Sequence, residues 1–504
     1  MNASEVASGS IYLTLQNILS TVIGVLGYSY LARGITQEEM GVVAGLTLLS
    51  SLTLTSIDLG VNTSIAKFVS EGVGSGKGYL HFVFSALTLR LPLALLASTL
   101  LYAFSTATSG ILFKTQAYSS LVSLVAVDVM VQSISQILNN TLWGLGRLKD
   151  MAVYGVASVA VRWAFITLFL FIGFSLKGVV FGWIAGDLTL LTLLSTSLKS
   201  VNLKVCRLNS VLKLVPSILK FSTPIYIAAL ISFLYSWYDR VLILAFLPLQ
   251  QLGVYNVAYT AFSVLAAIAS SLGSSLLPYY GSSYGRGDHE AVSEGVRRAS
   301  RYTALIMFPL ALGLASLSKP AITVFAGQQY EDGWMILAIL SAFSLVYGVS
   351  PAFSNILLIY GKTGTILLLN IISVGISFTL LPLTLFMGLT GLALMRGITI
   401  ASSFLITLHF ISKNIRVRVE LESLAKTLIS AATMAAITLT LQQTLQSNIL
   451  LPLYAAVAAS VYITLVRELK ILKSEDAGLI SNLAGRRLSK HIIKILNINH
   501  KTQK

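Results

Sequence analysis

The stretch "SWYDRVLILAF" (residues 236–246) places an adjacent acid and base, Asp239 and Arg240, inside a sequence that is otherwise apolar. The surrounding segment, 221–247, is long enough to cross the hydrocarbon core of a membrane, which needs about 20 residues. A charge near the middle of a bilayer costs roughly 2.5–3.5 kcal/mol on insertion scales. Interactions with other parts of the fold must offset this cost. The rest of the sequence indicates which residues can provide them.

The composition of the chain is that of a membrane protein. Of its 504 residues, 55% are hydrophobic and only 11% are charged, whereas soluble domains carry about 25% charged residues. Lipid offers backbone groups no hydrogen-bonding partners, so each apolar run that crosses the membrane should be an α-helix. We therefore predict an all-α integral membrane protein with about 14 transmembrane helices. The predicted spans are 9–32, 41–65, 81–107, 117–142, 153–174, 179–199, 221–247, 254–280, 301–325, 335–360, 363–387, 389–411, 423–443 and 449–466.

The distribution of lysine and arginine between alternate connections predicts the orientation. One side of the predicted membrane carries 27 of these residues and the other side only four. Connections rich in lysine and arginine stay in the cytoplasm, so we expect the 27 there, with both termini, in a multi-pass protein of the plasma membrane. The net charge of +16 then follows from topology and requires no nucleic acid as a partner. The four residues on the opposite side are Arg33, Lys114, Lys177 and Lys319.

A weak internal repeat indicates two related halves. "QEEMGVV" (37–43) reappears loosely as "LQQLGVY" (249–255), each in the turn between two predicted spans. The spans that follow end in Gly/Ser-rich loops, 70–78 and 281–288. Duplicated six-helix halves in the same orientation are typical of transporters, with the substrate path between them. The predicted domains are a six-helix lobe at 1–200, a cytoplasmic linker at 201–220, a second six-helix lobe at 221–411, two additional transmembrane helices at 412–466 and a basic cytoplasmic tail at 467–504.

Motifs for nucleotide, metal and nucleophilic chemistry are missing from the sequence. "EGVGSGKG" (71–78) and "IYGKTG" (359–364) lack the glycine spacing of a phosphate-binding loop. Cys206 is the only cysteine, and the five histidines have no metal-ligand spacing. We therefore expect no metal, no cofactor and no enzymatic activity. Transport must then be driven by an ion gradient or by the gradient of the substrate itself.

Apart from residues assigned to the connections, the sequence offers eight candidates for charge inside the membrane, four basic and four acidic, and equal numbers of each sign indicate neutralisation by pairing. Each is either half of a structural ion pair or a functional group. Arginines near span ends, Arg90 and Arg396, can equally extend to the membrane surface. The basic residues are Arg90, Arg162, Arg240 and Arg396, and the acidic ones are Asp58, Asp128, Asp187 and Asp239.

Arg162 lies well inside its predicted span, and Asp128 is the most deeply placed of Asp58, Asp128 and Asp187. Arg162 lies about nine residues into its span, roughly 13 Å at the helical rise of 1.5 Å, so it should face a cavity or a partner. Its planar guanidinium binds phosphate oxygens in pairs, which favours a substrate with a phosphate head group. Asp128 is a candidate to bind Na⁺ or exchange a proton, unless pairing with Arg162 makes it structural.

Five segments together resemble a known family. They are "LARGITQEEMGVVAGLTLLSSLTLTSIDLGVNTSIAKFVSE" (31–71), "YDRVLILAFLPLQQLGVYNVAYTAF" (238–262), "GQQYEDGWMILAILS" (327–341), "SNILLIYGKTG" (354–364) and "GLTGLALMRGIT" (388–399). The chain resembles the polysaccharide/oligosaccharide flippases of the multidrug/oligosaccharidyl-lipid/polysaccharide (MOP) exporter superfamily. The resemblance covers essentially all fourteen predicted spans, and it rests mostly on turn and packing residues.

The resemblance implies a V-shaped pair of six-helix lobes that works by alternating access, with cationic residues in a central cavity. The matching candidates for substrate binding are Arg33, Arg90, Arg162, Arg240 and Arg396. Arg33 departs from this picture, because the predicted topology puts it at the outer end of the first helix, where it can be an interfacial anchor. Adjacent helical residues point about 100° apart, so Asp239 and Arg240 should not face each other. We expect Asp239 to be a structural partner and Arg240 to face the cavity.

The predicted function is that of a lipid-linked oligosaccharide flippase. It would translocate a polyprenyl (pyro)phosphate glycan across the cytoplasmic membrane, coupled to H⁺ or Na⁺ or to no ion. Its partners would be membrane lipids, the glycan substrate and glycosyltransferases. One alternative is an ion-coupled multidrug or small-molecule antiporter of the same superfamily. Another is a membrane-embedded glycan polymerase, which the short external connections disfavour.

Overall fold

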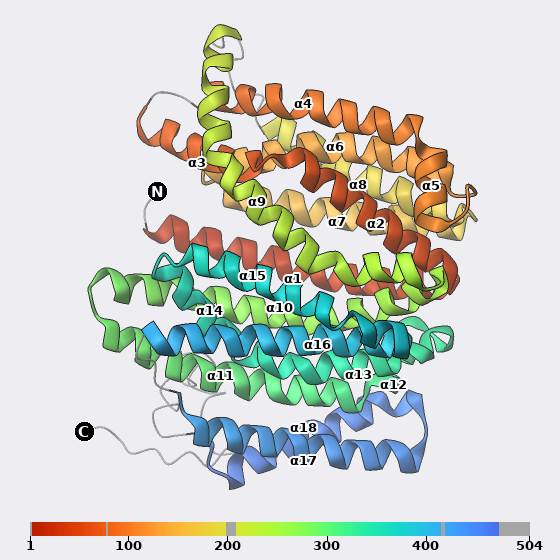
Figure 1. Cartoon of the computed structure of the whole chain (residues 1–504). Coiled ribbons are helices and arrows are strands. Elements are labelled where there is room, and N and C mark those ends of the chain that lie inside the picture. Colours follow the sequence, from red (N-terminus) through yellow and green to blue (C-terminus); the bar gives the residue numbers. More distant parts are fainter. Residues whose placement is uncertain (1–2, 77–78, 198–207, 415–418, 473–504) are drawn as a thin grey trace. The chain divides into compact units, whose positions relative to one another are not determined.

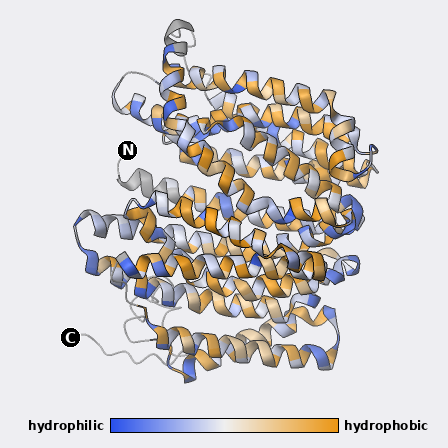
Figure 2. Ribbon diagram, viewed as in Figure 1, coloured by the Kyte–Doolittle hydropathy of each residue, from blue (hydrophilic) through white to orange (hydrophobic). Residues whose placement is uncertain are grey.

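The computed structural model describes residues 3–76, 79–197, 208–414 and 419–472, and these residues form helices joined by short turns (Figure 1). Within these ranges there are eighteen α-helices and no β-strand. Apolar residues run along the helices, and hydrophilic residues gather at helix ends and connections (Figure 2). The predicted all-α membrane fold is therefore confirmed.

The chain divides into two compact units, Met1–Asn256 and Val257–Lys504. In the first unit, helix α9 packs against α2, α3 and α4. The predicted lobes at 1–200 and 221–411 stay a prediction. Of the linker proposed between them, residues 201–207 lie outside the described residues, and residues 208–220 belong to α9. Most of the predicted tail, 473–504, also lies outside the described residues.

Among its described residues the first unit contains nine helices, and a tenth, α10, begins at its end. Their bounds are α1 Ala3–Gly34, α2 Gln37–Asp58, α3 Val61–Gly74, α4 Leu80–Ala103, α5 Ser105–Phe113, α6 Ser119–Gly144, α7 Leu148–Phe171, α8 Ser175–Ser197, α9 Leu208–Phe246 and α10 Leu249–Gly285. Helix α2 begins with a capping box, in which Thr36 accepts from the backbone N–H of Glu39 and the Glu39 carboxylate accepts from that of Thr36. This arrangement satisfies two of the amides that a helix start leaves without intrahelical partners.

The second unit contains the rest of α10 and the helices that follow it. Their bounds are α11 His289–Ser316, α12 Ser318–Ala326, η2 Gln328–Gly333, α13 Trp334–Phe343, η3 Ser344–Gly348, α14 Ser350–Ile359, α15 Thr363–Thr379, α16 Leu381–Asn414, α17 Leu421–Leu445, η4 Asn448–Leu450 and α18 Leu451–Glu468.

The predicted spans correspond to these helices with several corrections. Eleven described helices are individually long and apolar enough to cross a membrane, and two bent pairs raise the number to 13. The bends, of 79° between α11 and α12 and of 50° before α14, lie inside the spans predicted at 301–325 and 335–360. The span predicted at 363–387 is wrong in its length, because α15 ends at Thr379 after 17 residues. The span predicted at 41–65 breaks after Asp58, where Leu59 and Gly60 adopt left-handed conformations and α3 begins.

The two turns identified as a repeat, 37–43 and 249–255, lie against each other in the first unit. A Cβ atom on Gly41 would come within 2.1 Å of the Leu249 carbonyl oxygen, and one on Gly253 within 1.9 Å of the Gln37 carbonyl oxygen. Glycine therefore stands at the same position of each motif because the backbone of the other approaches it too closely for a side chain. The repeat in sequence thus has a reciprocal contact in the structure.

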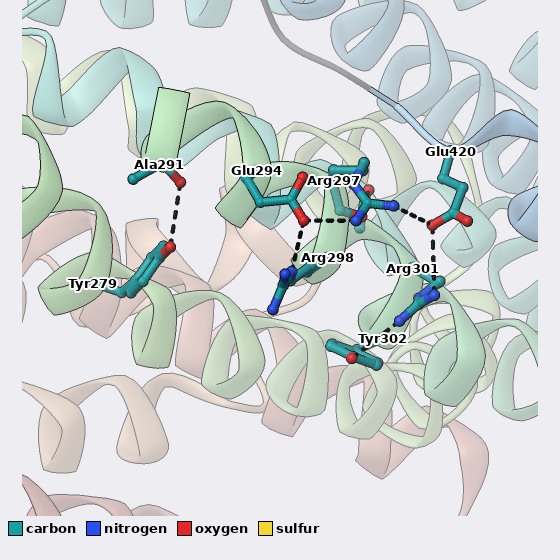
Figure 3. A network of polar contacts seen from close by, with 9 residues as sticks. Tyr279, Ala291, Glu294, Arg297, Arg298, Arg301, Tyr302 and Glu420 are labelled. Carbon is teal, nitrogen blue, oxygen red and sulfur yellow. Dashed lines mark hydrogen bonds and ion pairs between the residues drawn. The ribbon is translucent and has the colours of Figure 1, made fainter. Parts of the chain in front are cut away.

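The two additional helices, α17 and α18, are held to α11 by both apolar and charged contacts. Glu420, at the start of α17, lies 3.1 Å from Arg297 and 3.6 Å from Arg301 of α11 (Figure 3). Glu294 accepts from Arg297 at 2.6 Å and from Arg298 at 2.7 Å. This network fixes one end of α17 to α11.

Candidate functional site

The best-defined charged cluster of the first unit lies between α6, α7 and α8. Arg162 of α7 donates from Nη2 to Asp187 Oδ1 of α8 at 2.7 Å. The Asp187 side chain is only 7% exposed, whereas 32% of the Arg162 side chain remains exposed. Arg162 is therefore held by a buried carboxylate and still presents part of its guanidinium outward. The sequence-based alternative, in which Arg162 pairs with Asp128, is replaced by pairing with Asp187.

Asp128 of α6 belongs to the same cluster and is fully buried. Its Oδ2 accepts from Gln132 Nε2, one helical turn later, at 2.7 Å. Among the described residues, its Oδ1 has no hydrogen-bond partner, and the same holds for Asp187 Oδ2 and for Arg162 Nε. Buried polar atoms normally have a hydrogen-bond partner. Three buried polar atoms without one, in a single cluster, therefore indicate a place for a ligand, an ion, a proton or water.

Gly186 of α8 determines how closely α7 approaches this cluster. A Cβ atom at position 186 would lie 2.7 Å from Arg162 Cβ, 3.0 Å from the Ser158 carbonyl oxygen and 3.2 Å from Arg162 Nε. Ser158 in turn donates to the Gly186 carbonyl at 2.9 Å. The absence of a side chain therefore allows the two helices to bring Arg162 and Asp187 together.

We expect Gly186→Ala to lower the thermal stability of the protein while leaving both charged groups in place. The added methyl meets backbone as well as side chain, so α7 and α8 must separate, and such overpacking typically costs about 1–3 kcal/mol. The measurement is thermal unfolding of the purified protein in detergent. Gly110→Ala is the matched control, since a Cβ there meets no atom within 4 Å. Wild-type stability for Gly186→Ala would contradict this role of Gly186.

Arg90 of α4 is at the centre of a second polar cluster, and its side chain is fully buried. It forms an ion pair with Asp58, the last residue of α2. It also donates to Gln136 Oε1 at 2.9 Å and to Ser133 Oγ at 3.2 Å, both on α6. Asn62 of α3 donates to the same Gln136 oxygen at 3.0 Å. This arrangement joins four helices and leaves Arg90 no exposed surface.

Asp239 and Arg240 of α9 contact each other, so the expectation that they face apart is wrong. Arg240 Nη1 lies 3.4 Å from Asp239 Oδ1, because the flexible arginine side chain folds back toward the preceding residue. Asp239 is fully buried and accepts from Tyr255 Oη at 2.6 Å. Arg240 is 7% exposed, donates to Asn256 Oδ1 at 3.3 Å and lies 4.7 Å from the Trp237 ring. Hydrogen bonds, an ion pair and a cation–π contact together offset the cost of burying this charge.

Two candidate arginines remain, one in each unit. Arg396 of α16, in the second unit, is buried and donates to Tyr259 Oη at 3.5 Å. Its guanidinium lies 5.9 Å from the Tyr259 ring centroid. Arg33 is exposed in the last turn of α1.

Sequence reasoning missed the uncharged polar residues that complete each cluster. They are Asn62, Gln132, Ser133, Gln136, Tyr255 and Asn256. A signal for one of them was available, because Gln132 follows Asp128 by four residues and therefore lies on the same helix face. Within the described residues, no group of three or more histidine, cysteine, aspartate or glutamate side chains could hold a metal ion.

Comparison with known proteins places this arrangement in a family. The model of a family described as "Polysaccharide biosynthesis protein" matches residues 30–335. The chain belongs to this family. The match contains all nine helices from α2 to α10 and therefore the three charged clusters of the first unit.

Two curated proteins are similar to this chain in sequence. The chain is 20% identical over 459 residues to a protein of Haloferax volcanii named "Probable low-salt glycan biosynthesis flippase Agl15", covering 90% of this chain and 93% of the relative. It is 26% identical over 125 residues to the "Teichuronic acid biosynthesis protein TuaB" of Bacillus subtilis, covering 25% of this chain and 26% of that protein.

Solved structures confirm the fold. The lipid II flippase MurJ in an inward closed conformation has a TM-score of 0.72 at 15% identity, covering 92% of this chain and 99% of that chain. An inward-facing multidrug resistance MATE family transporter of the MOP superfamily has a TM-score of 0.64 at 14% identity, covering 80% and 98%. The chain is thus a multi-pass membrane protein with the fold of MOP-superfamily transporters.

Proposed function

We propose that this protein is a flippase that moves a polyprenyl phosphate- or pyrophosphate-linked oligosaccharide across the plasma membrane. The observation that carries the proposal is its similarity, over 90% of the chain, to a protein named as a glycan biosynthesis flippase. The family match over residues 30–335 supports the same substrate class. These two similarities favour a flippase over the alternative predicted from the sequence, a multidrug antiporter.

The charged cluster at Arg162 suits a phosphate head group. One third of the Arg162 side chain is exposed, and Asp187 holds only one of its terminal nitrogens. The guanidinium can therefore accept an anionic oxygen on its remaining edge without leaving Asp187, and paired contacts of this kind are strong and directional. Arg90 and Arg240 are buried and ion-paired, so we infer that they support the helices and that Arg162 meets the substrate.

The test of this function is transport by the purified protein in liposomes. Lipid-linked oligosaccharide extracted from the source cells is incorporated into the vesicles, and its transfer between leaflets is followed by enzymatic modification of the outward-facing glycan. We expect protein-dependent transfer of the glycolipid and no extrusion of a cationic dye under an ion gradient. Dye extrusion without glycolipid transfer would replace the flippase with the antiporter.

Asp128 is the proposed site of ion coupling. It is buried, one of its oxygens has no hydrogen-bond partner among the described residues, and it lies beside the Arg162–Asp187 pair. A carboxylate in this position can take up and release H⁺ or Na⁺, and doing so changes the charge of the cluster that holds Arg162. Ion binding and substrate binding would then be linked through Asp187 and Arg162.

We expect Asp128→Asn to lose the response to an imposed H⁺ or Na⁺ gradient while still equilibrating substrate slowly. Asparagine keeps the shape and the hydrogen bond with Gln132 but cannot carry the charge. Flipping is measured in proteoliposomes with and without each gradient. Asp150→Asn is the matched control, because Asp150 forms a partly exposed ion pair with Arg147 in the first turn of α7. Unchanged gradient dependence in Asp128→Asn would rule this residue out as the coupling site.

A further inference from the structure

A polar cavity of about 640 Å³ lies in the second unit, where α12 and η2 meet the last turns of α17. These elements lie at the same end of the unit (Figure 1). Among its lining residues are Trp334, the first residue of α13, and three glutamines at the end of α17, Gln442, Gln443 and Gln446. Ligand pockets in proteins measure about 300–1,000 Å³, so the cavity has the size of a small-molecule site.

The charges of the cavity cancel. Lys319 of α12 and Glu331 of η2 both line it, and Lys319 Nζ lies 2.7 Å from Glu331 Oε1. No arginine is among the lining residues. A site for a phosphate group usually supplies excess positive charge and guanidinium or amide N–H donors. The cavity therefore favours a neutral, polar ligand over an anionic head group.

The glutamines supply a dense set of hydrogen-bonding groups. Each primary amide has two N–H donors and one carbonyl acceptor. Gln442 and Gln443 lie in the last turn of α17, and Gln446 directly follows the helix in a left-handed conformation. Among the described residues, the side chains of Gln442, Gln443 and Gln446 make no hydrogen bond or ion pair with protein groups. Their donors and acceptors are available to a ligand.

Trp334 adds an aromatic surface to this polar lining and is 38% exposed. An indole ring combines an apolar face with one N–H donor. A sugar ring has the complementary character, because its hydroxyl groups donate and accept hydrogen bonds around the edge while its C–H faces pack on aromatic rings. We propose that this cavity is a binding site for the saccharide part of the transported glycolipid.

The position of the cavity indicates at which stage of transport the saccharide would be bound. Lys319 is among the four basic residues on the side of the membrane predicted to face outward, so the saccharide would be bound after it has crossed. The end of α17 opposite Glu420 supplies Gln442 and Gln443, which gives this helix a role in the site. The identity of the ligand rests on the proposed function, whereas the polarity and neutrality of the cavity do not.

The test is protection of a single cysteine from a maleimide reagent. Gln443→Cys in a Cys206→Ser background places an exposed thiol on the cavity lining. The full-length protein in lipid nanodiscs is labelled with and without oligosaccharides released by mild acid from the lipid-linked fraction of the source cells. We expect the oligosaccharides to slow labelling at least threefold. Adding Gln442→Leu and Gln446→Leu should abolish the protection.

Two controls make the result specific. A cysteine at Gln116, an exposed residue in the turn between α5 and α6, should label at the same rate with and without the oligosaccharides. Inorganic phosphate at equal concentration should not protect Gln443→Cys, and protection by phosphate alone would overturn the saccharide assignment in favour of an anion. Size-exclusion chromatography of each variant establishes that it is folded.

The outcomes separate this inference from the proposed function. Glycolipid transfer in liposomes without protection of Gln443→Cys overturns the saccharide site and leaves the flippase standing. Protection that persists in the Gln442→Leu/Gln446→Leu variant also overturns it, because binding would then lie elsewhere. Protection that the double variant abolishes, in a protein that transfers no glycolipid, supports the site and overturns the flippase.

Discussion

Arg162→Ala should reduce glycolipid flipping roughly 10- to 100-fold in a protein that still folds. The range corresponds to the loss of a hydrogen bond with a charged group, about 1.5–3 kcal/mol. The substitution removes the exposed guanidinium edge and also leaves Asp187 as a buried carboxylate without its cation. Arg162→Lys keeps the charge but loses the planar fork, so it should retain part of the activity. Flipping is measured in proteoliposomes, and folding by size-exclusion chromatography and thermal unfolding.

A double variant separates substrate binding from structural support. In Arg162→Ala/Asp187→Ala, neither charge of the pair remains, so stability should return toward that of the wild type. Flipping should remain low, because the group that meets the substrate is still missing. Recovery of flipping in the double variant, or wild-type flipping in both Arg162 variants, would make Arg162 a structural residue. Lys177→Ala, which removes an exposed basic residue at the start of α8, is the control for net charge.

Arg90→Ala should cause the largest loss of stability among the charged substitutions. Arg90 is fully buried and interacts with Asp58, Ser133 and Gln136. Removing one partner of a buried ion pair typically costs about 3–5 kcal/mol, because the other charge is left uncompensated. The free energy of unfolding is measured by titration with SDS in mixed micelles. Lys177→Ala, an exposed position, should change it by no more than about 0.5 kcal/mol.

Replacing both charges tests whether the Arg90 pair is structural. Arg90→Met/Asp58→Leu fills the space with apolar side chains, and such replacements are often neutral. Gln136 keeps its hydrogen bond with Asn62 in this variant. We expect the double variant to recover most of the stability lost in Arg90→Ala and to flip glycolipid at a measurable rate. A stable double variant without any flipping would instead place Arg90 in the substrate path.

The sequence alone could identify the spans and predict that their charges must be compensated. Hydropathy is a local property, so an apolar run of the right length indicates a helix without knowledge of its neighbours. The same argument fails where a helix bends or ends early, as between α11 and α12 or at Thr379. Bends depend on packing against other helices, and composition does not report them.

What the sequence by itself determined was the class of protein, the approximate position of its helices and the residues that carry charge inside the membrane. The tertiary structure decided the partners: Arg162 with Asp187 and not with Asp128, and Arg240 with the adjacent Asp239. It also revealed the amide-lined cavity at the end of α17. The physical reason is that pairing depends on the rotation of each helix and on its distance from the next, which a glycine such as Gly186 can set. These quantities arise only when helices far apart in the chain pack together.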